Sequence, residues 1–250
     1  MSGAGQRVIA VTGANRGIGS AIAEELAQRG YVVGCLSRKG KGMEDRKPAD
    51  DIAARLVPFA CDLLDENSIK SAIDDLVRTA GRLDGLVNNA GLHLEGPSAE
   101  FATADFERVM NTNVTGLFVA CREAFPHLLK GEQPTIINIG SFFQSLGAKL
   151  NLAYGASKTA VGSLTRGLAV EWAEHGIRVL NVAPGFVATD LNREYMQQEG
   201  FRKFLANRIP AGGPCPPEEI ARLVGTLFDE NLPFLTGETI VIDGGQTINQ

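Results

Sequence analysis

The fold of this chain is decided by the stretch Val8-Ile9-Ala10-Val11-Thr12-Gly13-Ala14-Asn15-Arg16-Gly17-Ile18-Gly19. Its apolar first half predicts a buried strand, and its three glycines predict a tight turn that leads into a helix. Glycine allows backbone angles and close approaches that a Cβ forbids, and the free N–H groups at a helix start bind phosphate. The stretch therefore predicts a dinucleotide site. Its glycine spacing differs from the commonest G-x-G-x-x-G fingerprint, so an ordinary strand-to-helix turn is the alternative.

Strand and helix patterns alternate along the whole chain. Short apolar runs rich in branched residues predict seven buried strands, at Val8–Thr12, Tyr31–Leu36, Leu56–Cys61, Leu86–Asn88, Thr135–Ile139, Val179–Ala183 and Thr239–Ile242. Amphipathic segments between most of them predict helices at Gly19–Arg29, Asn67–Thr79, Phe101–Leu129, Ala153–Glu174 and Pro217–Phe228. This alternation predicts an α/β fold with one doubly wound Rossmann domain over residues 1–250, a seven-stranded parallel sheet and helices on both faces. The charged, glycine-bearing stretch Lys39–Pro48 predicts a surface loop.

The composition excludes several classes of protein. Hydrophobic residues make up 44% of the chain and charged residues 21%, as in ordinary globular proteins. The net charge of -5 predicts no attraction to nucleic acid or to an anionic membrane surface. Four scattered cysteines and three histidines predict neither a disulfide framework nor a metal site. No transmembrane run and no secretory signal are recognisable, so we expect a cytoplasmic protein.

Tyr154 and Lys158 carry the strongest chemical signal. They stand four residues apart, so on a helix the phenol and the ammonium share one face. A nearby cation favours the phenolate, and we therefore expect the pKa of Tyr154 to lie below its ordinary value of about 10. This pair, with the hydroxyl of Ser141, predicts a general acid for carbonyl chemistry. A solvated surface pair is the alternative for Tyr-x-x-x-Lys taken alone.

Several motifs together resemble those of the short-chain dehydrogenase/reductase family. They stand in the family's order and spacing: Thr12-Gly13-x-x-x-Gly17-x-Gly19, Asn88-Asn89-Ala90-Gly91, Asn113, Ser141, Tyr154-x-x-x-Lys158 and Pro184-Gly185. Only residues from about 39 to 52 and from about 189 to 217 lack a recognisable family motif. The chain is similar in particular to NADP-dependent 3-oxoacyl reductase-like and carbonyl reductase members.

The resemblance implies a catalytic set of Asn113, Ser141, Tyr154 and Lys158. In the family, the tyrosine gives a proton to the carbonyl oxygen while the nicotinamide delivers hydride to the carbonyl carbon. The serine steadies that oxygen, the lysine holds the nicotinamide ribose, and the asparagine carries a water chain. As alternatives, Asn113 satisfies backbone groups in a helix kink, and Ser141 caps its own turn.

The resemblance also implies the cofactor-binding residues. They are Gly13, Asn15, Arg16, Gly17, Ile18, Gly19, Arg38, Asp62, Leu63, Asn89, Ala90, Gly91, Tyr154, Lys158, Pro184, Gly185, Val187 and Thr189. Enzymes that prefer NAD place an acidic residue after the second strand, whereas an arginine there grips a 2′-phosphate bidentately. Arg38 stands at this position, so the sequence predicts NADP(H), with a solvated loop start as the alternative. In the family, the position of Asp62 binds the adenine amino group, and a helix cap is its alternative role.

Residues 189–217 correspond to the segment that relatives use as a substrate lid. Aromatic and apolar side chains in and near it predict a partly apolar pocket or lid packing, from Phe142, Phe143, Phe186, Tyr195, Met196, Phe201 and Phe204. Relatives are commonly tetramers, so a homotetramer is expected by resemblance. The favoured function is NADP(H)-dependent interconversion of a small carbonyl compound and an alcohol. A 3-oxoacyl-thioester reductase and a polyol or sugar dehydrogenase are alternatives, and a non-catalytic dinucleotide-binding module is the alternative of another class.

Overall fold

The computed structural model describes residues 6–189 and 198–249, and a seven-stranded sheet lies at its centre. The strand order is β3-β2-β1-β4-β5-β6-β7, and each neighbouring pair is parallel. The strands are β1 (Val8–Thr12), β2 (Val32–Ser37), β3 (Leu56–Ala60), β4 (Gly85–Asn88), β5 (Thr135–Ile139), β6 (Arg178–Pro184) and β7 (Thr239–Ile242). The predicted doubly wound parallel sheet is therefore confirmed. Its order reverses between β1 and β4, where such sheets bind ligands.

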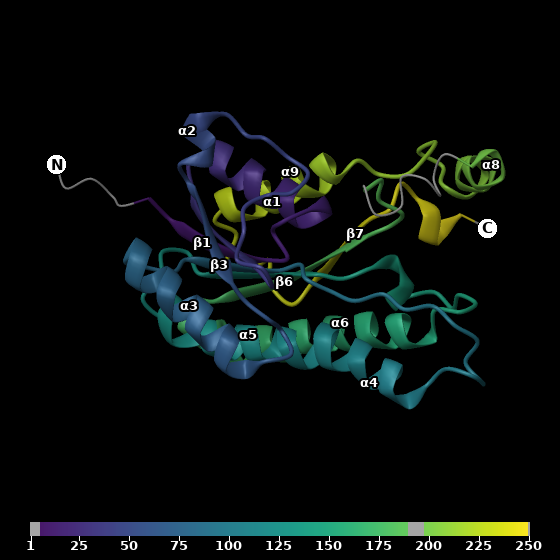
Figure 1. Ribbon diagram of the computed structural model, residues 1–250, viewed down its shortest axis with the longest axis horizontal. Helices are drawn as coiled ribbons and strands as arrows, with labels where there is room; N and C mark the ends of the chain where they lie inside the picture. The colour runs from purple at the N-terminus through teal and green to yellow at the C-terminus, as the bar shows by residue number, and fades with distance from the viewer. Residues whose placement is uncertain (1–5, 190–197, 250) are drawn as a thin grey trace.

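Two helical layers cover the sheet (Figure 1). One face carries α1 (Gly17–Gln28) and α9 (Pro217–Asp229), and the other carries α3 (Glu66–Ala80), α5 (Gly116–Leu128) and α6 (Leu152–Trp172). Shorter helices are α2 (Asp50–Ala53), α4 (Thr103–Met110) and α8 (Glu199–Arg208). Single turns are η1 (Asn111–Thr115), η2 (Phe142–Gln144), η3 (Ala173–His175) and η4 (Gln246–Ile248). Across the described ranges, no helix combines the length and apolar character that crossing a bilayer requires.

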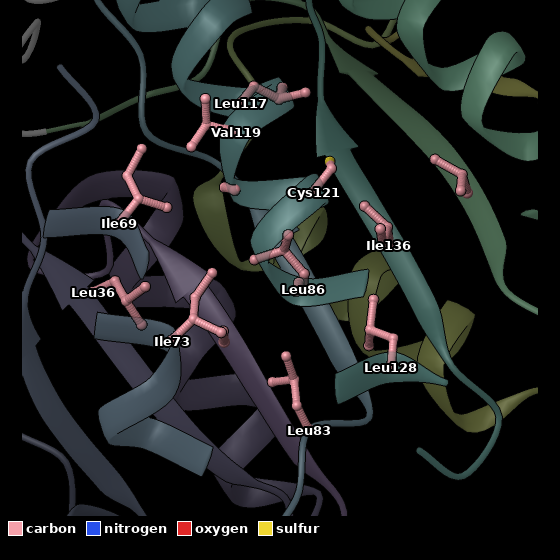
Figure 2. Packing of buried hydrophobic residues seen from close by; sticks show 14 of the residues in the cluster. Leu36, Ile69, Ile73, Leu83, Leu86, Leu117, Val119, Cys121, Leu128 and Ile136 are labelled. Atoms are coloured by element: carbon pink, nitrogen blue, oxygen red, sulfur yellow. The ribbon is translucent and has the colours of Figure 1, made fainter. Parts of the chain in front are cut away.

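Each face of the sheet has its own hydrophobic core. Successive residues of β1 divide between them: Val8 packs toward α3 and α5, and Ile9 toward α1 and α9. Figure 2 shows the first core, where Ile73 of α3 lies with Leu86 of β4 and Ile136 of β5. Because both sides of every central strand are buried, the strands read as continuous apolar runs rather than as alternating ones.

The predicted long helix Phe101–Leu129 is observed as a continuous helical run from Thr103 to Leu128, but it is not uniform. The chain forms α4 and α5, separated by η1, which is one turn of π-helix. Asn113 lies in this turn, and its side chain is buried. A π turn adds one residue to the helical repeat, which an apolar pattern does not register.

The two segments without a family motif differ in structure. Residues 39–49 form a loop, as predicted for most of that stretch, before the four-residue α2. The lid segment contains α8, which the sequence pattern did not predict. Residues 190–197, including Tyr195 and Met196, lie outside the described part of the chain.

Candidate active site and cofactor site

The predicted site residues follow the carboxyl ends of four neighbouring strands. The glycine turn follows β1, Asn89 follows β4, Ser141 follows β5 and Gly185 follows β6. The side-chain amide of Asn89 donates to the carbonyl oxygens of Thr12 at 3.0 Å and Gly13 at 3.3 Å. Adjacent parallel strands end at the same edge of the sheet, so the glycine turn after β1 and the Asn89 segment after β4 are held together by these hydrogen bonds.

Helix α6 brings Tyr154 and Lys158 to this edge. The hydroxyl of Tyr154 lies near that of Ser141, and the ammonium of Lys158 lies 5.5 Å from the centre of the tyrosine ring. The Lys158 Nζ donates to the carbonyl oxygen of Ile139, at the end of β5, at 2.7 Å. Ser141 begins η2 and accepts a hydrogen bond from the Phe143 amide at 3.3 Å. Ser141 therefore caps its own turn and also faces the tyrosine hydroxyl.

The pKa of Tyr154 is shifted in the direction opposite to the sequence-based expectation. Burial disfavours the phenolate and raises the pKa to about 12, and the nearby hydroxyl of Ser141, which lowers the pKa, opposes this only in part. Helical spacing correctly placed the lysine near the ring, but spacing says nothing about how much water the fold removes from the phenol. At neutral pH the tyrosine is therefore a protonated phenol, ready to donate.

Lys158 is a buried cation, with only 5% of its surface exposed. Burial lowers its pKa from 10.5 to about 8, because the charged form loses its hydration. The carbonyl of Ile139 stabilises the ammonium through one hydrogen bond. The chain therefore pays a free-energy cost to hold a positive charge beside the tyrosine.

Asn113 joins three parts of the site. Its Oδ1 accepts from the Leu92 amide at 2.7 Å, and its Nδ2 donates to the Leu92 carbonyl and to the Ser157 hydroxyl, both at 2.9 Å. These bonds tie the π turn to the segment after β4 and to α6. The alternative role, satisfying backbone groups at a helix irregularity, is therefore observed. The predicted water chain stays a prediction.

The glycine turn, here called the glycine cradle, is a close-packed connection between β1 and α1 that requires glycine. Gly13 and Gly17 have φ angles of +67° and +62°, which favour glycine. A Cβ on Gly19 would lie 2.2 Å from the Gly13 carbonyl oxygen, so only glycine fits there. The threonine at 189 lies against the same turn, because a Cβ on Gly17 would be 3.5 Å from its methyl group. The glycines thus let β1 turn sharply into α1, and the first N–H groups of such a helix are the groups that bind phosphate.

An unsatisfied polar atom beside the cradle supports the fit of a dinucleotide. Ser37 ends β2 and is 6% exposed, and its Oγ has no hydrogen-bond partner in the described residues. Buried hydroxyls normally have a partner. The residues that would hold the cofactor's phosphates and ribose are therefore the α1 amides, Ser37 and the exposed side chains of Arg16 and Arg38.

The other predicted cofactor residues lie around the same edge. Asp62 follows β3 and accepts a hydrogen bond from the Leu64 amide at 3.0 Å; the N-cap of α3 is Asp65, so Asp62 is not the helix cap. The remaining predicted cofactor residues lie near the ends of four strands. Asn15 and Ile18 lie at the glycine turn and the start of α1, and Leu63 follows β3. Ala90 and Gly91 follow β4, Pro184 ends β6, and Val187 lies shortly after it. A Cβ on Gly91 would lie 3.3 Å from Asn113 Oδ1 and 3.8 Å from Lys158 Nζ. Gly91 therefore lies where the predicted cofactor residues after β4 meet the predicted catalytic residues.

Sequence reasoning missed His93, whose ring packs at a tilt against the ring of Tyr154. The centres of the His93 and Tyr154 rings are 4.4 Å apart. The imidazole Nε2 is hydrogen-bonded to the Asn151 side chain and lies 3.6 Å from the Glu95 carboxylate. Its position two residues after Gly91 was the available signal, since that places it just past the Asn89 motif. His93, Asn151 and Glu95 form a polar group, here called the polar rim, beside the reactive phenol.

Aromatic rings continue from Tyr154 toward the lid segment. The Phe143 ring lies 5.9 Å from the Tyr154 ring and 4.3 Å from the Phe142 ring. Phe186 then lies 5.3 Å from Phe142 and 5.8 Å from Phe201 of α8. Packing between lid and body, one of the two expected roles of these aromatic residues, is therefore present.

Comparisons with known proteins agree with this geometry. A family model described as enoyl-(acyl carrier protein) reductase matches residues 13–247. The chain is 37% identical over 248 residues to glucose 1-dehydrogenase of Gluconobacter oxydans (strain 621H), with 98% of this chain and 93% of that one covered. It is 32% identical over 239 residues to human 3-oxoacyl-[acyl-carrier-protein] reductase, with 96% and 97% covered.

A solved structure shares the fold closely. The chain superposes on a putative short-chain alcohol dehydrogenase from Sinorhizobium meliloti 1021 with a TM-score of 0.91, 30% identity and 98% of each chain covered. The fold and the comparisons therefore define an oxidoreductase whose relatives use nicotinamide dinucleotides. The chain belongs to the short-chain dehydrogenase/reductase family.

Proposed function

We propose that this chain interconverts a small ketone or aldehyde and an alcohol with NADP(H), and that Tyr154 is the general acid or base. The observation that carries the proposal is the contact of Tyr154 with Ser141 and Lys158 beside the glycine cradle. When bound, the nicotinamide supplies or accepts the hydride. Tyr154 gives its proton to the carbonyl oxygen, Ser141 donates a hydrogen bond to that oxygen, and the buried charge of Lys158 favours the phenolate that forms.

The remaining proposals concern organisation. We propose one catalytic domain over residues 1–250 with a lid at 189–217, acting in the cytoplasm as a homotetramer. Exposed apolar side chains on α5 and α6, including Phe118 and Val170, support association through these helices. Asn113 is proposed to pass protons through a water chain, because one lone pair of its Oδ1 remains after the bond from Leu92.

A second candidate, a polyol or sugar dehydrogenase, is favoured by the polar rim. Imidazole, amide and carboxylate groups beside the phenol are suited to substrate hydroxyls, since each hydroxyl both donates and accepts. Glucose 1-dehydrogenase of Gluconobacter oxydans, which is named for the oxidation of a sugar, is among the relatives. The third candidate, a 3-oxoacyl-thioester reductase, is favoured by the human relative.

A substrate panel tests the proposal. NADPH oxidation is measured with simple ketones, aromatic ketones and an acetoacetyl thioester, and NADP⁺ reduction with sugars and polyols. We expect turnover with at least one ketone or aldehyde. Turnover confined to sugars would select the second candidate, and turnover confined to the thioester the third. Cofactor binding without turnover of any compound would support a non-catalytic module instead.

Cofactor preference is tested at Arg38. We expect kcat/KM to be higher with NADPH than with NADH, because a guanidinium binds a 2′-phosphate bidentately. Arg38→Asp should lower kcat/KM for NADPH by about 10- to 100-fold, the size of a lost charge-assisted bond, and spare NADH. Arg78→Asp makes the same charge change near the end of α3, far from the glycine turn. It should leave the ratio of kcat/KM with NADPH to kcat/KM with NADH unchanged. A wild-type preference for NADH that Arg38→Asp does not alter would contradict the proposal.

A further inference from the structure

The loop after β2 folds back over the glycine turn. The Glu44 amide donates to the Asn15 carbonyl at 2.7 Å, and the Gly17 amide donates to Asp45 Oδ2 at 2.6 Å. Gly17 is the first residue of α1, and the side chain of its N-cap residue, Arg16, makes no capping hydrogen bond. Asp45 therefore supplies the start of α1 with an anion from within the chain.

Arg46 holds this loop in place. Its guanidinium donates to the Ser20 hydroxyl at 3.2 Å and to the Glu24 carboxylate at 2.9 Å, both on α1, and also to Glu218 on α9. Together with the bond from the Glu44 amide to Asn15, these contacts fix the chain on both sides of Asp45. The bond between Asp45 and Gly17 is therefore part of a fastened structure rather than a chance surface contact.

The surroundings of Asp45 contain more donors than this carboxylate uses. Neither Arg16 nor Arg38 forms an ion pair or a side-chain hydrogen bond with any residue in 6–189 or 198–249. Asp45 Oδ1 is buried and has no partner in the same ranges. Arg16 is the N-cap residue of α1, and Arg38 stands two residues past Leu36, whose carbonyl accepts from the Gly13 and Ala14 amides of the glycine turn. Two guanidinium groups without a partner in these ranges thus flank the turn in the chain, and a helix start with such cations is the setting of an anion site. Asp45 uses one N–H of that helix start.

The buried hydroxyl of Ser37 lies on the same side of the sheet. Side chains alternate along β2: Leu36 packs into the core under α3 and α5, whereas Cys35 packs into the core under α1. Ser37 therefore points toward α1, where its Oγ has no partner among the described residues. This buried, unpaired donor is independent of the helix start, and it indicates that a ligand completes the bonding here.

We propose that Asp45 sets how strongly this chain selects a dinucleotide with a 2′-phosphate. The inference rests on the proposed dinucleotide binding. A 2′-phosphate that approaches Arg38 and the start of α1 meets the Asp45 carboxylate on the Gly17 amide, and like charges repel. The phosphate must displace this carboxylate, whereas a ribose hydroxyl can donate a hydrogen bond to it. Asp45 thus lowers the preference for NADP(H) that the two arginines create.

The experiment measures binding rather than turnover. Calorimetric titrations with 2′,5′-ADP and 5′-AMP compare the wild type with Asp45→Asn, which keeps the size of the side chain and an oxygen that accepts from Gly17. Asp45→Ser serves as a second variant, and thermal unfolding verifies that each protein folds. Glu44→Gln is the matched control, because it removes the same charge from the exposed neighbour, whose carboxylate lies 3.6 Å from Lys39.

We expect Asp45→Asn and Asp45→Ser to bind 2′,5′-ADP about tenfold more tightly, the effect of one charge-assisted contact. Binding of 5′-AMP should change by less than about twofold, and Glu44→Gln should behave as the wild type. Equal affinity of all four proteins for 2′,5′-ADP, or an equal gain in Glu44→Gln, would overturn the inference alone. Absence of any nucleotide binding in all four would overturn the proposed function and this inference with it. A wild type that prefers 5′-AMP and a variant that prefers 2′,5′-ADP would support the inference while refuting the NADP(H) preference.

Discussion

Replacing Tyr154 by phenylalanine is expected to lower kcat by about 10²- to 10⁴-fold, the usual contribution of a general acid. The ring keeps its half-buried place next to His93 and Phe143, so its neighbours keep their positions. Only the hydroxyl near Ser141 is lost. Stability should therefore fall by no more than about 1 kcal/mol, the net worth of one ordinary hydrogen bond. Steady-state kinetics with the best substrate of the panel measures the effect.

The chain offers a matched control in Tyr31, whose hydroxyl donates to Asp229 at 2.6 Å, away from the strand ends that form the site. Tyr31→Phe also removes a tyrosine hydroxyl, yet it should leave kcat unchanged. Cofactor affinity, followed by fluorescence titration, should be nearly the same in Tyr154→Phe and the wild type. Turnover in Tyr154→Phe within a factor of ten of the wild type would show that another group delivers the proton.

The strands and the clustering of the candidate site residues could be predicted because both carry local signals. Central strands such as β1 are buried on two faces and therefore appear as unbroken apolar runs. The Tyr154 and Lys158 pair follows from helical spacing, and the structure places both side chains at one edge. The glycine turn was readable because positive φ angles and a close approach leave little choice of residue there.

Other features depend on contacts between distant parts of the chain, which no local pattern contains. The π turn at Asn113 is bonded to Leu92 and Ser157, so its register depends on two other segments. Asp45 lies in a loop that reads as solvated charge, and only the fold places it on Gly17. The direction of the Tyr154 pKa shift follows from burial by the whole molecule, which spacing within one helix cannot supply.

The buried charge of Lys158 should be visible in the stability of the protein at alkaline pH. In the folded state its pKa is about 8, against 10.5 for an unperturbed lysine. Between these two values the unfolded chain holds more protons on this lysine than the folded protein does, so the free energy of unfolding rises with pH. Each unit of difference is worth about 1.4 kcal/mol, so the rise approaches about 3 kcal/mol across the window. Below pH 8 both states carry the charge, and the destabilisation is present in full.

Lys158→Met isolates this effect. The free energy of unfolding of the wild type minus that of Lys158→Met should increase from pH 8 to pH 10.5, as measured by urea denaturation at a series of pH values. Titrating groups far from residue 158 contribute equally to both proteins and cancel, and Tyr154, whose pKa is about 12, titrates above this window. Lys158→Arg is the matched control, because a guanidinium keeps its proton throughout this range. The free energy of unfolding of Lys158→Arg minus that of Lys158→Met should therefore not change with pH. A flat difference for the wild type as well would show that the ammonium is solvated in the folded protein. An increase would mean that the chain gives up stability near neutral pH to keep a cation beside Tyr154, as the proposed proton transfer requires.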